Sequence, residues 1–185
     1  MKLRLSLLAL PLLLAACATL PPPGCVKLGP GAMCLLAPAA LPAIDDTHLV
    51  TVTRDGKQDT FMGRLAIDAH TLRLAGASLF GTGLFDISYD GRTIDAQPPR
   101  AKAHAELMLA MLEITLADPA ALRSHLHDLT LKVGERDDNE VRDLYTHGRL
   151  VAHIERSKEP LAKARIRIEI PAAKTSLDML PLDRR

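Results

Sequence analysis

Dipeptides that end in glycine, set between segments of alternating apolar and polar residues, most constrain the fold of this chain. Asp55-Gly56, Asp90-Gly91 and His147-Gly148 are such dipeptides. They favour the tight turn of a β-hairpin, and an apolar residue at every second position is typical of a strand with one buried face. From about residue 44 onward, the sequence therefore predicts a succession of short antiparallel hairpins.

The boundaries of the expected strands follow from these turns. We expect strands at residues 47–54, 59–68, 71–75, 84–89, 92–96, 129–133, 141–145, 149–156 and 162–170, and a last short strand at Leu177 and Met179. The segment 162–170 alternates most clearly, with apolar and charged side chains on opposite faces. One face of the sheet is therefore expected to contact solvent, and the other to contact helices or a ligand.

The middle of the chain changes to a helical pattern. Residues 104–116 place apolar side chains three and four positions apart, which predicts an amphipathic helix. Asp118 and Pro119 then suit the N-cap and the first position of a second short helix that extends to residue 126. The expected fold is mainly β with a helical insertion: a curved antiparallel sheet with a helical plug or lid.

The N-terminal residues have the layout of an export signal. A basic start at residues 1–4 precedes the apolar run 5–14, which is too short to cross a bilayer as a helix. Residues 14–17, Leu-Ala-Ala-Cys, resemble the bacterial lipobox, in which cleavage precedes a cysteine that carries diacylglycerol. The alternative is an ordinary signal with an incidental cysteine. We therefore expect a signal peptide at residues 1–16 and a lipid anchor at Cys17.

The predicted anchor and the charge balance bear on location and partners. In enteric-type bacteria, Asp after the lipidated cysteine retains a lipoprotein in the inner membrane, whereas Ala18 stands here. We therefore expect the chain on the periplasmic face of the outer membrane, held there by its acyl chains. With 23 Lys and Arg against 22 Asp and Glu, three Phe, two Tyr and no Trp, a general nucleic-acid binder is disfavoured.

Residues 17–43 are expected to connect the anchor to the folded domain. Pro21 to Pro23 form a stiff extended segment, and the Pro- and Ala-rich stretch that follows has no regular pattern. Cys25 and Cys34 flank a turn-rich segment, so in an oxidising compartment we expect a disulfide between them. The alternatives are two free thiols and a metal site. A metal site is disfavoured because no third or fourth ligand lies nearby in the sequence. The expected domain spans residues 44–185.

Residues 72–87 resemble the hairpin of the LolB family of outer-membrane lipoprotein receptors, in which two strands flank a protruding apolar tip. The likeness continues through the helical segments 104–116 and 118–126. The chain is still more similar to a family of proteobacterial lipoproteins with a LolB-like domain of unknown function, some of whose genes lie in aryl-polyene biosynthesis clusters. Shared features are the Pro-rich start, the cysteine pair and the Leu-Phe strand after the tip.

This resemblance implies an open antiparallel half-barrel of the LolA/LolB type, with a short helical lid and an apolar concave face that holds acyl chains. It also implies that Leu79 and Phe80 form a membrane-inserting tip. Gly76, Gly81 and Gly83 around them favour an exposed turn, and the alternative is that Leu79 and Phe80 fold back into the core. Periodicity alone predicts the ligand candidates as ordinary core residues. The candidates are Phe61, Leu65, Ile67, Leu72, Leu74, Phe85, Ile87, Met108, Met111, Leu112, Ile166 and Ile168.

Polar clusters indicate no catalytic chemistry. Motifs of serine hydrolases, zinc proteases and phosphate-binding loops are missing from the sequence. Asp137, Asp138 and Glu140 are interpreted as solvated charges of a turn. His125 and His127 lie at a helix end without an evident third ligand, so we predict no metal and no cofactor.

The leading hypothesis is a monomeric, non-enzymatic lipoprotein that binds a hydrophobic ligand. The ligand would be an acyl chain, a lipoprotein or a polyene-type lipid, received from or passed to the membrane or a periplasmic carrier protein. The alternative is an interaction protein whose sheet packs tightly against its own lid and which docks a partner in an envelope complex.

Overall fold

The computed structural model describes residues 24–182, so the predicted signal peptide and Cys17 lie outside the described residues. Most of the chain forms one antiparallel sheet of ten strands. Its strands are β3 (Ile44–Arg54), β4 (Lys57–Ile67), β5 (Leu72–Ala77), β6 (Gly83–Tyr89), β7 (Ile94–Gln97), β9 (Thr130–Arg136), β10 (Asn139–Thr146), β11 (Arg149–Ser157), β12 (Ile166–Ile170) and β13 (Thr175–Pro181). The prediction of a mainly β fold is confirmed.

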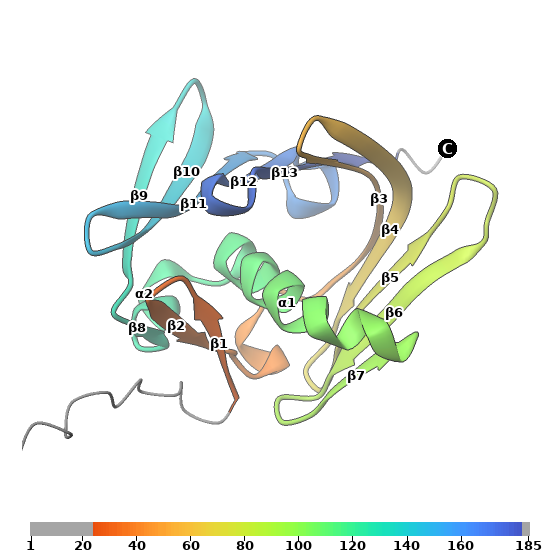
Figure 1. Cartoon of the computed structure of the whole chain (residues 1–185), viewed down its shortest axis with the longest axis horizontal. Coiled ribbons are helices and arrows are strands. Elements are labelled where there is room, and N and C mark those ends of the chain that lie inside the picture. The colour runs from red at the N-terminus through yellow and green to blue at the C-terminus, as the bar shows by residue number, and fades with distance from the viewer. Residues whose placement is uncertain (1–23, 183–185) are drawn as a thin grey trace, which may run out of the picture.

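The order of the strands makes the sheet open. It runs β7-β6-β5-β4-β3-β13-β12-β11-β10-β9, so β7 and β9 are edges that do not pair with each other. The last strand, β13, pairs with β3 and thereby joins the N-terminal hairpins to the C-terminal hairpins. The sheet curves around a central helix, α1 (Lys102–Leu116) (Figure 1). This arrangement agrees with the expected open antiparallel sheet around a helical insertion.

All three predicted hairpins are present, but Asp90-Gly91 is part of a four-residue connection between β6 and β7, in which Gly91 has positive φ and Asp90 does not. Asp55-Gly56 and His147-Gly148 both have positive φ at each residue, which is the conformation that two-residue hairpin turns require. Asp137 and Asp138 form a third turn of this kind between β9 and β10, so the polar turn is shorter than the expected segment 135–140. Aspartate tolerates the left-handed region better than most residues, which explains its use here.

Two predicted segments are wrong at one end. The strand expected from residue 162 begins only at Ile166, because Leu161–Lys163 form a 3-10 turn. The second helix, α2 (Pro119–Arg123), ends early, and the chain enters strand β8 (Leu126–His127). Asp118 is its N-cap, as expected, and its side chain accepts a hydrogen bond from the N–H of Ala120. The other 3-10 turns are Pro38–Ala40, Pro99–Ala101 and Pro171–Ala173.

The expected irregular tether is wrong for the part of it that the structure describes. Residues 25–34 form a hairpin of β1 (Cys25–Leu28) and β2 (Gly31–Cys34), and β8 completes a small sheet of order β1-β2-β8. This sheet buries Val26 and Met33 in the core. The predicted disulfide joins Cys25 to Cys34, which are direct cross-strand partners. The folded unit therefore begins well before the predicted boundary at residue 44.

The small sheet explains the burial of α1. Residues 109–117 are buried on all sides, because the large sheet covers one side of the helix and the small sheet covers the other (Figure 1). Arg142 of β10 is also buried and donates to the carbonyl oxygens of Ile114 and Ala117, at 2.7 Å each. A cation at this position complements the helix dipole. The C-terminal half of α1 is thus a core helix, and its N-terminal half is the more exposed part.

None of the helices in the described residues combines the length and the apolar character needed to cross a bilayer.

Candidate functional site

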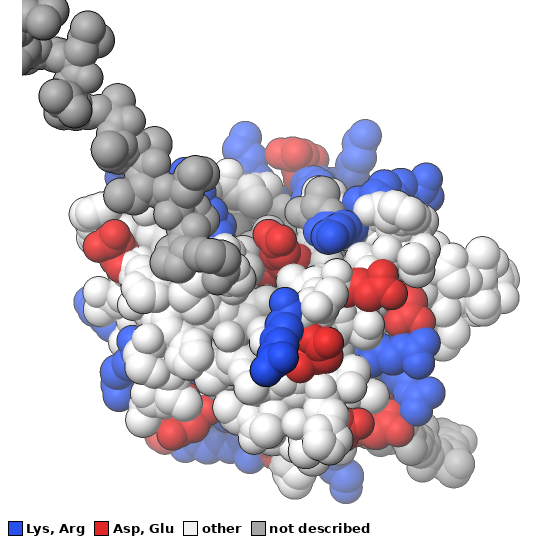
Figure 2. All heavy atoms as spheres, turned by 90° about the horizontal axis from the view of Figure 1, so that it is seen from below, with Lys and Arg blue, Asp and Glu red and all other residues white. Residues whose placement is uncertain are grey.

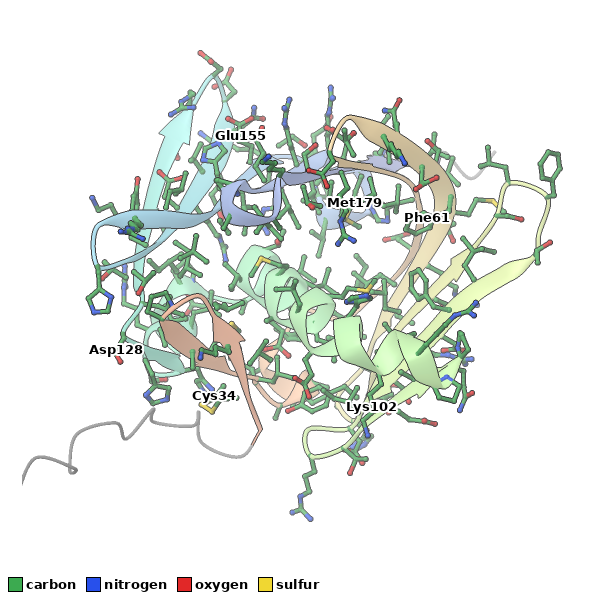
Figure 3. The ribbon with its side chains drawn as sticks, in the orientation of Figure 1. Cys34, Phe61, Lys102, Asp128, Glu155 and Met179 are labelled. Atoms are coloured by element: carbon green, nitrogen blue, oxygen red, sulfur yellow. A yellow bond between two sulfur atoms is a disulfide. The ribbon has the colours of Figure 1, made fainter. Side chains whose placement is uncertain are left out.

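A cavity of about 310 Å³ lies between α1 and the concave face of the large sheet. Its walls come from β3, β4, β12 and β13 on one side and from α1 on the other, with contributions from β5 and β6. Phe61 and Met179, labelled in Figure 3, belong to the sheet wall. The lining residues are Val50, Val52, Arg54, Phe61, Gly63, Leu65, Leu74, Phe85, His104, Leu107, Met108, Met111, Leu112, Ile168, Ile170, Thr175, Leu177 and Met179.

Cross-strand register builds the sheet wall. Met179 of β13 pairs with Val50 of β3, which in turn pairs with Phe61 of β4, and all three line the cavity. Two residues further along β3, Val52 pairs with Leu177, and both line the cavity, whereas the β4 partner of Val52 is Asp59, which does not. Because side chains alternate along each strand, these rows put apolar groups on one face of three neighbouring strands. The wall is therefore a product of register as much as of composition.

Gly76 shapes the wall near β6. A Cβ at this position would lie 2.6 Å from Cζ of Phe85, so only glycine lets the ring lie against β5. The Phe85 ring then meets the Phe61 ring edge to face, with centroids 5.7 Å apart. The sequence interpretation of Gly76 as part of the exposed turn is therefore wrong: it lies within β5 and accommodates an aromatic ring.

Most of the predicted ligand-contacting residues line the cavity. Those that do are Phe61, Leu65, Leu74, Phe85, Met108, Met111, Leu112 and Ile168. Ile67, Leu72 and Ile166 share faces with them but are buried in the core, and Ile87 is fully buried beside a second hollow. Alternation identifies which face of a strand is apolar, but it does not tell which residues along that face line the cavity.

Sequence reasoning missed more than half of the sheet wall. Val50 and Val52 of β3 and Leu177 and Met179 of β13 line the cavity although they were not among the candidates. Val50 and Val52 alternate with Thr51 and other polar residues, which is a usable signal for a one-faced strand. The missing information was the pairing of β13 with β3, which are far apart in the sequence.

A second, more open hollow adjoins the cavity. It shares Phe85, His104 and Met108 with the cavity and extends to Leu84 and Arg100. Three residues of the main cavity carry polar side chains: Arg54 at the end of β3, Thr175 at the start of β13 and His104 in the first turn of α1. The polar groups therefore stand at element ends, and the interior of the cavity is apolar.

The tip between β5 and β6 is exposed rather than folded back. Phe80 exposes 97% of its surface and Leu79 exposes 56%. The turn is held by Ser78, whose carbonyl accepts from the N–H of Gly81 at 2.9 Å and whose N–H donates to the carbonyl of Thr82 at 2.8 Å. Gly81 has a φ of +84°, which favours glycine there. Insertion of this tip into a membrane stays a prediction.

Two buried titratable groups, Glu113 of α1 and His48 of β3, were not predicted. Glu113 is fully buried, and its Oε2 accepts a hydrogen bond of 2.8 Å from the N–H of Leu36, which ties the N-terminal segment to the helix. Burial raises the pKa of Glu113 to about 8, although the Leu36 hydrogen bond opposes this. Burial also lowers the pKa of His48, although Asp46 opposes it. Both groups are therefore mainly neutral near pH 7.

Other polar residues fall into structural roles. Glu140 does not lie in a solvated turn as expected: it is in β10, half-buried, and ion-paired with Arg142 and Arg156. The Nδ1 of His125 lies 3.0 Å from the carbonyl oxygen of Cys34. Ligand atoms of His127 and the two cysteines lie within 4.8 Å of one another, but the disulfide removes the thiolates that a metal would bind.

Charges of both signs are interspersed on the molecular surface. On the face seen in Figure 2, basic and acidic side chains lie close to one another and are separated by uncharged surface. Arg64 pairs with Asp45 and Arg73 pairs with Asp86 on exposed parts of the sheet. The visible surface therefore has no large region of one sign.

Comparison with known proteins identifies one family. Residues 45–183 match the family described as "Protein of unknown function (DUF3261)". A search of curated proteins finds no match for the chain. The family match begins at the start of β3, so the small sheet formed by β1, β2 and β8 lies partly outside it.

Proposed function

The chain belongs to the DUF3261 family of proteins of unknown function, and we propose that this member holds a hydrophobic ligand in the cavity beneath α1. The proposal includes a lipid anchor at Cys17 on the periplasmic face of the outer membrane. It also includes a LolB-like mode of action, in which an acyl chain, lipoprotein or polyene-type lipid is received from or passed to another carrier or the membrane.

The apolar cavity is the observation that carries this proposal. Protein interiors normally leave few voids larger than a water molecule, so a chain shaped by stability alone would fill this space. A volume of about 310 Å³ lies at the small end of the range for ligand sites. Met108 and Met111 on the helix side adapt to irregular apolar shapes. The alternative of a docking protein expects a closely packed core beneath the helix, and the cavity favours the carrier.

The exposed tip supports an action at a membrane. Burial of Leu79 and Phe80 in lipid would contribute about 1.5–3 kcal/mol for each fully buried side chain. Leu84, at the start of β6, is also exposed and extends the apolar surface from the tip toward the second hollow. The tip would therefore bring the open side of the cavity close to the lipid surface.

Lipid mass spectrometry tests the proposal. The full chain carrying Cys17→Ser is exported to the periplasm and purified without detergent, and its extract is compared with that of the same chain carrying Met108→Trp. The indole would occupy cavity space, whereas Leu150→Trp places the same side chain at an exposed site away from the cavity. We expect one acyl or polyene species per chain, retained by the Leu150 variant and lost from the Met108 variant.

Two results would contradict the proposal. One is a folded chain that carries no lipid and takes up no neutral apolar fluorophore such as N-phenyl-1-naphthylamine. The other is lipid retained equally by all three chains, because a ligand held elsewhere would not respond to filling of this cavity. Circular dichroism establishes that each variant is folded, and fractionation of membranes with and without Cys17→Ser tests the anchor separately.

A further inference from the structure

One end of the cavity carries a cation. Arg54 is the last residue of β3, and Thr175 is the first residue of β13; they are register partners, and both line the cavity. Their side chains are 3.5 Å apart, from Nε of the guanidinium to Oγ1 of the hydroxyl. This distance is at the limit of a hydrogen bond, so the guanidinium keeps its donors available.

Arg54 has no acidic partner among the described residues, unlike Arg64 and Arg73 on the neighbouring strands β4 and β5. Arg64 and Arg73 each form an ion pair with an aspartate across the strands, whereas Arg54 forms no ion pair with any residue between 24 and 182. An exposed arginine gains little from its position unless another group completes its surroundings. A guanidinium is well suited to bind carboxylate or phosphate through two parallel hydrogen bonds.

Neighbouring charges favour an anion at this end. Lys57 pairs directly with Arg54 across β3 and β4, and alternation puts it on the same face as Phe61, which lines the cavity. Lys174 precedes Thr175 on the neighbouring strand. Asp59 shares the face of Lys57, and Asp55 follows Arg54 in the turn. These two acidic residues offset two of the three basic residues Arg54, Lys57 and Lys174, which leaves a net positive charge.

The volume of the cavity limits the number of chains. An engineered apolar cavity of about 150 Å³ takes up one benzene molecule. The present cavity is about 310 Å³. On that scale it holds roughly a dozen carbon atoms, which is one acyl chain and not two or three.

We propose that the cavity takes a single-chain amphiphile with an anionic head, whose carboxylate or phosphate binds Arg54 and whose chain lies along Val52 and Phe61. This inference rests on the proposed function and names the class of its ligand. The head would be a carboxylate in a free fatty acid or a phosphate in a lysophospholipid, because both present oxygen pairs that a guanidinium binds.

The position of the tip is consistent with uptake from a membrane. Met62 of β4 pairs with Ala77 of β5, so the tip at residues 78–82 lies toward the same end of the sheet as the β3–β4 turn. Figure 1 shows the β3–β4 turn at the top of the molecule and the β5–β6 tip at its right. A chain bound with its tip in lipid would therefore present Arg54 and Lys57 toward the head groups.

Displacement of N-phenyl-1-naphthylamine measures the preference for head groups. The probes are dodecanoate, monododecyl phosphate and 1-dodecanol, which share one chain and differ in the head, and the protein is the full chain carrying Cys17→Ser. We expect at least one of the anions to bind about tenfold more tightly than the alcohol, which corresponds to about 1.4 kcal/mol. Arg54→Gln should abolish that preference and leave the affinity for 1-dodecanol unchanged.

Arg149→Gln is the matched control. Arg149 is also an exposed arginine at a strand end without an ion pair among the described residues, but it lies outside the cavity lining. Preference for dodecanoate would assign a fatty acid, and preference for the phosphate would assign a phospholipid head. Equal affinities for all three probes, or an equal loss of all three in Arg54→Gln, would overturn this inference and leave the carrier proposal standing. Failure of the fluorophore itself to bind would overturn both.

Discussion

Replacing Glu113 with Gln tests whether the fold holds a neutral carboxyl group against α1. The pKa of Glu113 is about 8 in the folded chain, against an ordinary value of 4.5, because the side chain is buried. Between these values the folded state binds one more proton than the unfolded state. The stabilising contribution of this proton is therefore complete below pH 4.5 and is lost as the pH rises to about 8.

The expected magnitude follows from this difference. The free energy of unfolding of the wild-type chain should fall by up to about 1.4 kcal/mol per pH unit in this range because of Glu113. Glutamine does not titrate, and its amide oxygen can still accept the hydrogen bond from Leu36. The stability of Glu113→Gln relative to wild type should therefore rise by about 3–4 kcal/mol between pH 5 and pH 8.

Urea unfolding followed by far-ultraviolet circular dichroism, with the disulfide intact, measures this difference at each pH. His48 and His153 titrate in both proteins, so their contributions cancel in the comparison. Glu106→Gln is the control, because Glu106 is an exposed residue of the same helix. If Glu113→Gln and wild type show parallel pH profiles, the buried carboxyl group does not have the raised pKa and the reasoning is wrong.

Two further predictions concern the attachment of α1 and the tip. Arg142→Met should lower the free energy of unfolding by about 3–5 kcal/mol, because the carbonyl oxygens at the end of α1 and the carboxylate of Glu140 lose their buried donor. Urea titration measures this loss of stability, and Arg149→Met, at an exposed site, is the control. If Arg142→Met loses no more stability than Arg149→Met, Arg142 does not stabilise the end of α1. Phe80→Asp should leave stability unchanged because the side chain is 97% exposed, yet weaken sedimentation with phospholipid vesicles about tenfold. Val133→Asp removes another exposed apolar side chain, and equal vesicle binding by the two variants would exclude a specific role of the tip.

Much of the fold followed from local pattern. Alternation in segments such as 59–68, together with the Asp55-Gly56 turn, predicted hairpins that the structure contains. Residues 25–34 were the main failure: four-residue strands are too short to give a clear period, and their burial depends on contact with α1. The early end of α2 has a similar cause, because Leu126 and His127 pair with β2.

The sequence predicted which face of each strand carries the candidate site, but not which residues along that face line the cavity. Leu65 and Ile67 share one face of β4 and are both buried in the core, yet only Leu65 lines the cavity, because alternation along a strand does not say where the cavity ends. Arg54 ends the strand predicted at residues 47–54, and the pairing of β13 with β3, which sequence did not reveal, puts Thr175 beside it.

The sequence alone determined which segments become strands and helices and which face of each is apolar, because these properties depend on residues a few positions apart. Tertiary structure decided what that face encloses. The bond from Leu36 to Glu113 and those from Arg142 to the end of α1 join residues distant in the sequence, and together they set where the helix lies over the sheet. The cavity exists because of that placement, and no local pattern encodes the space left between two elements.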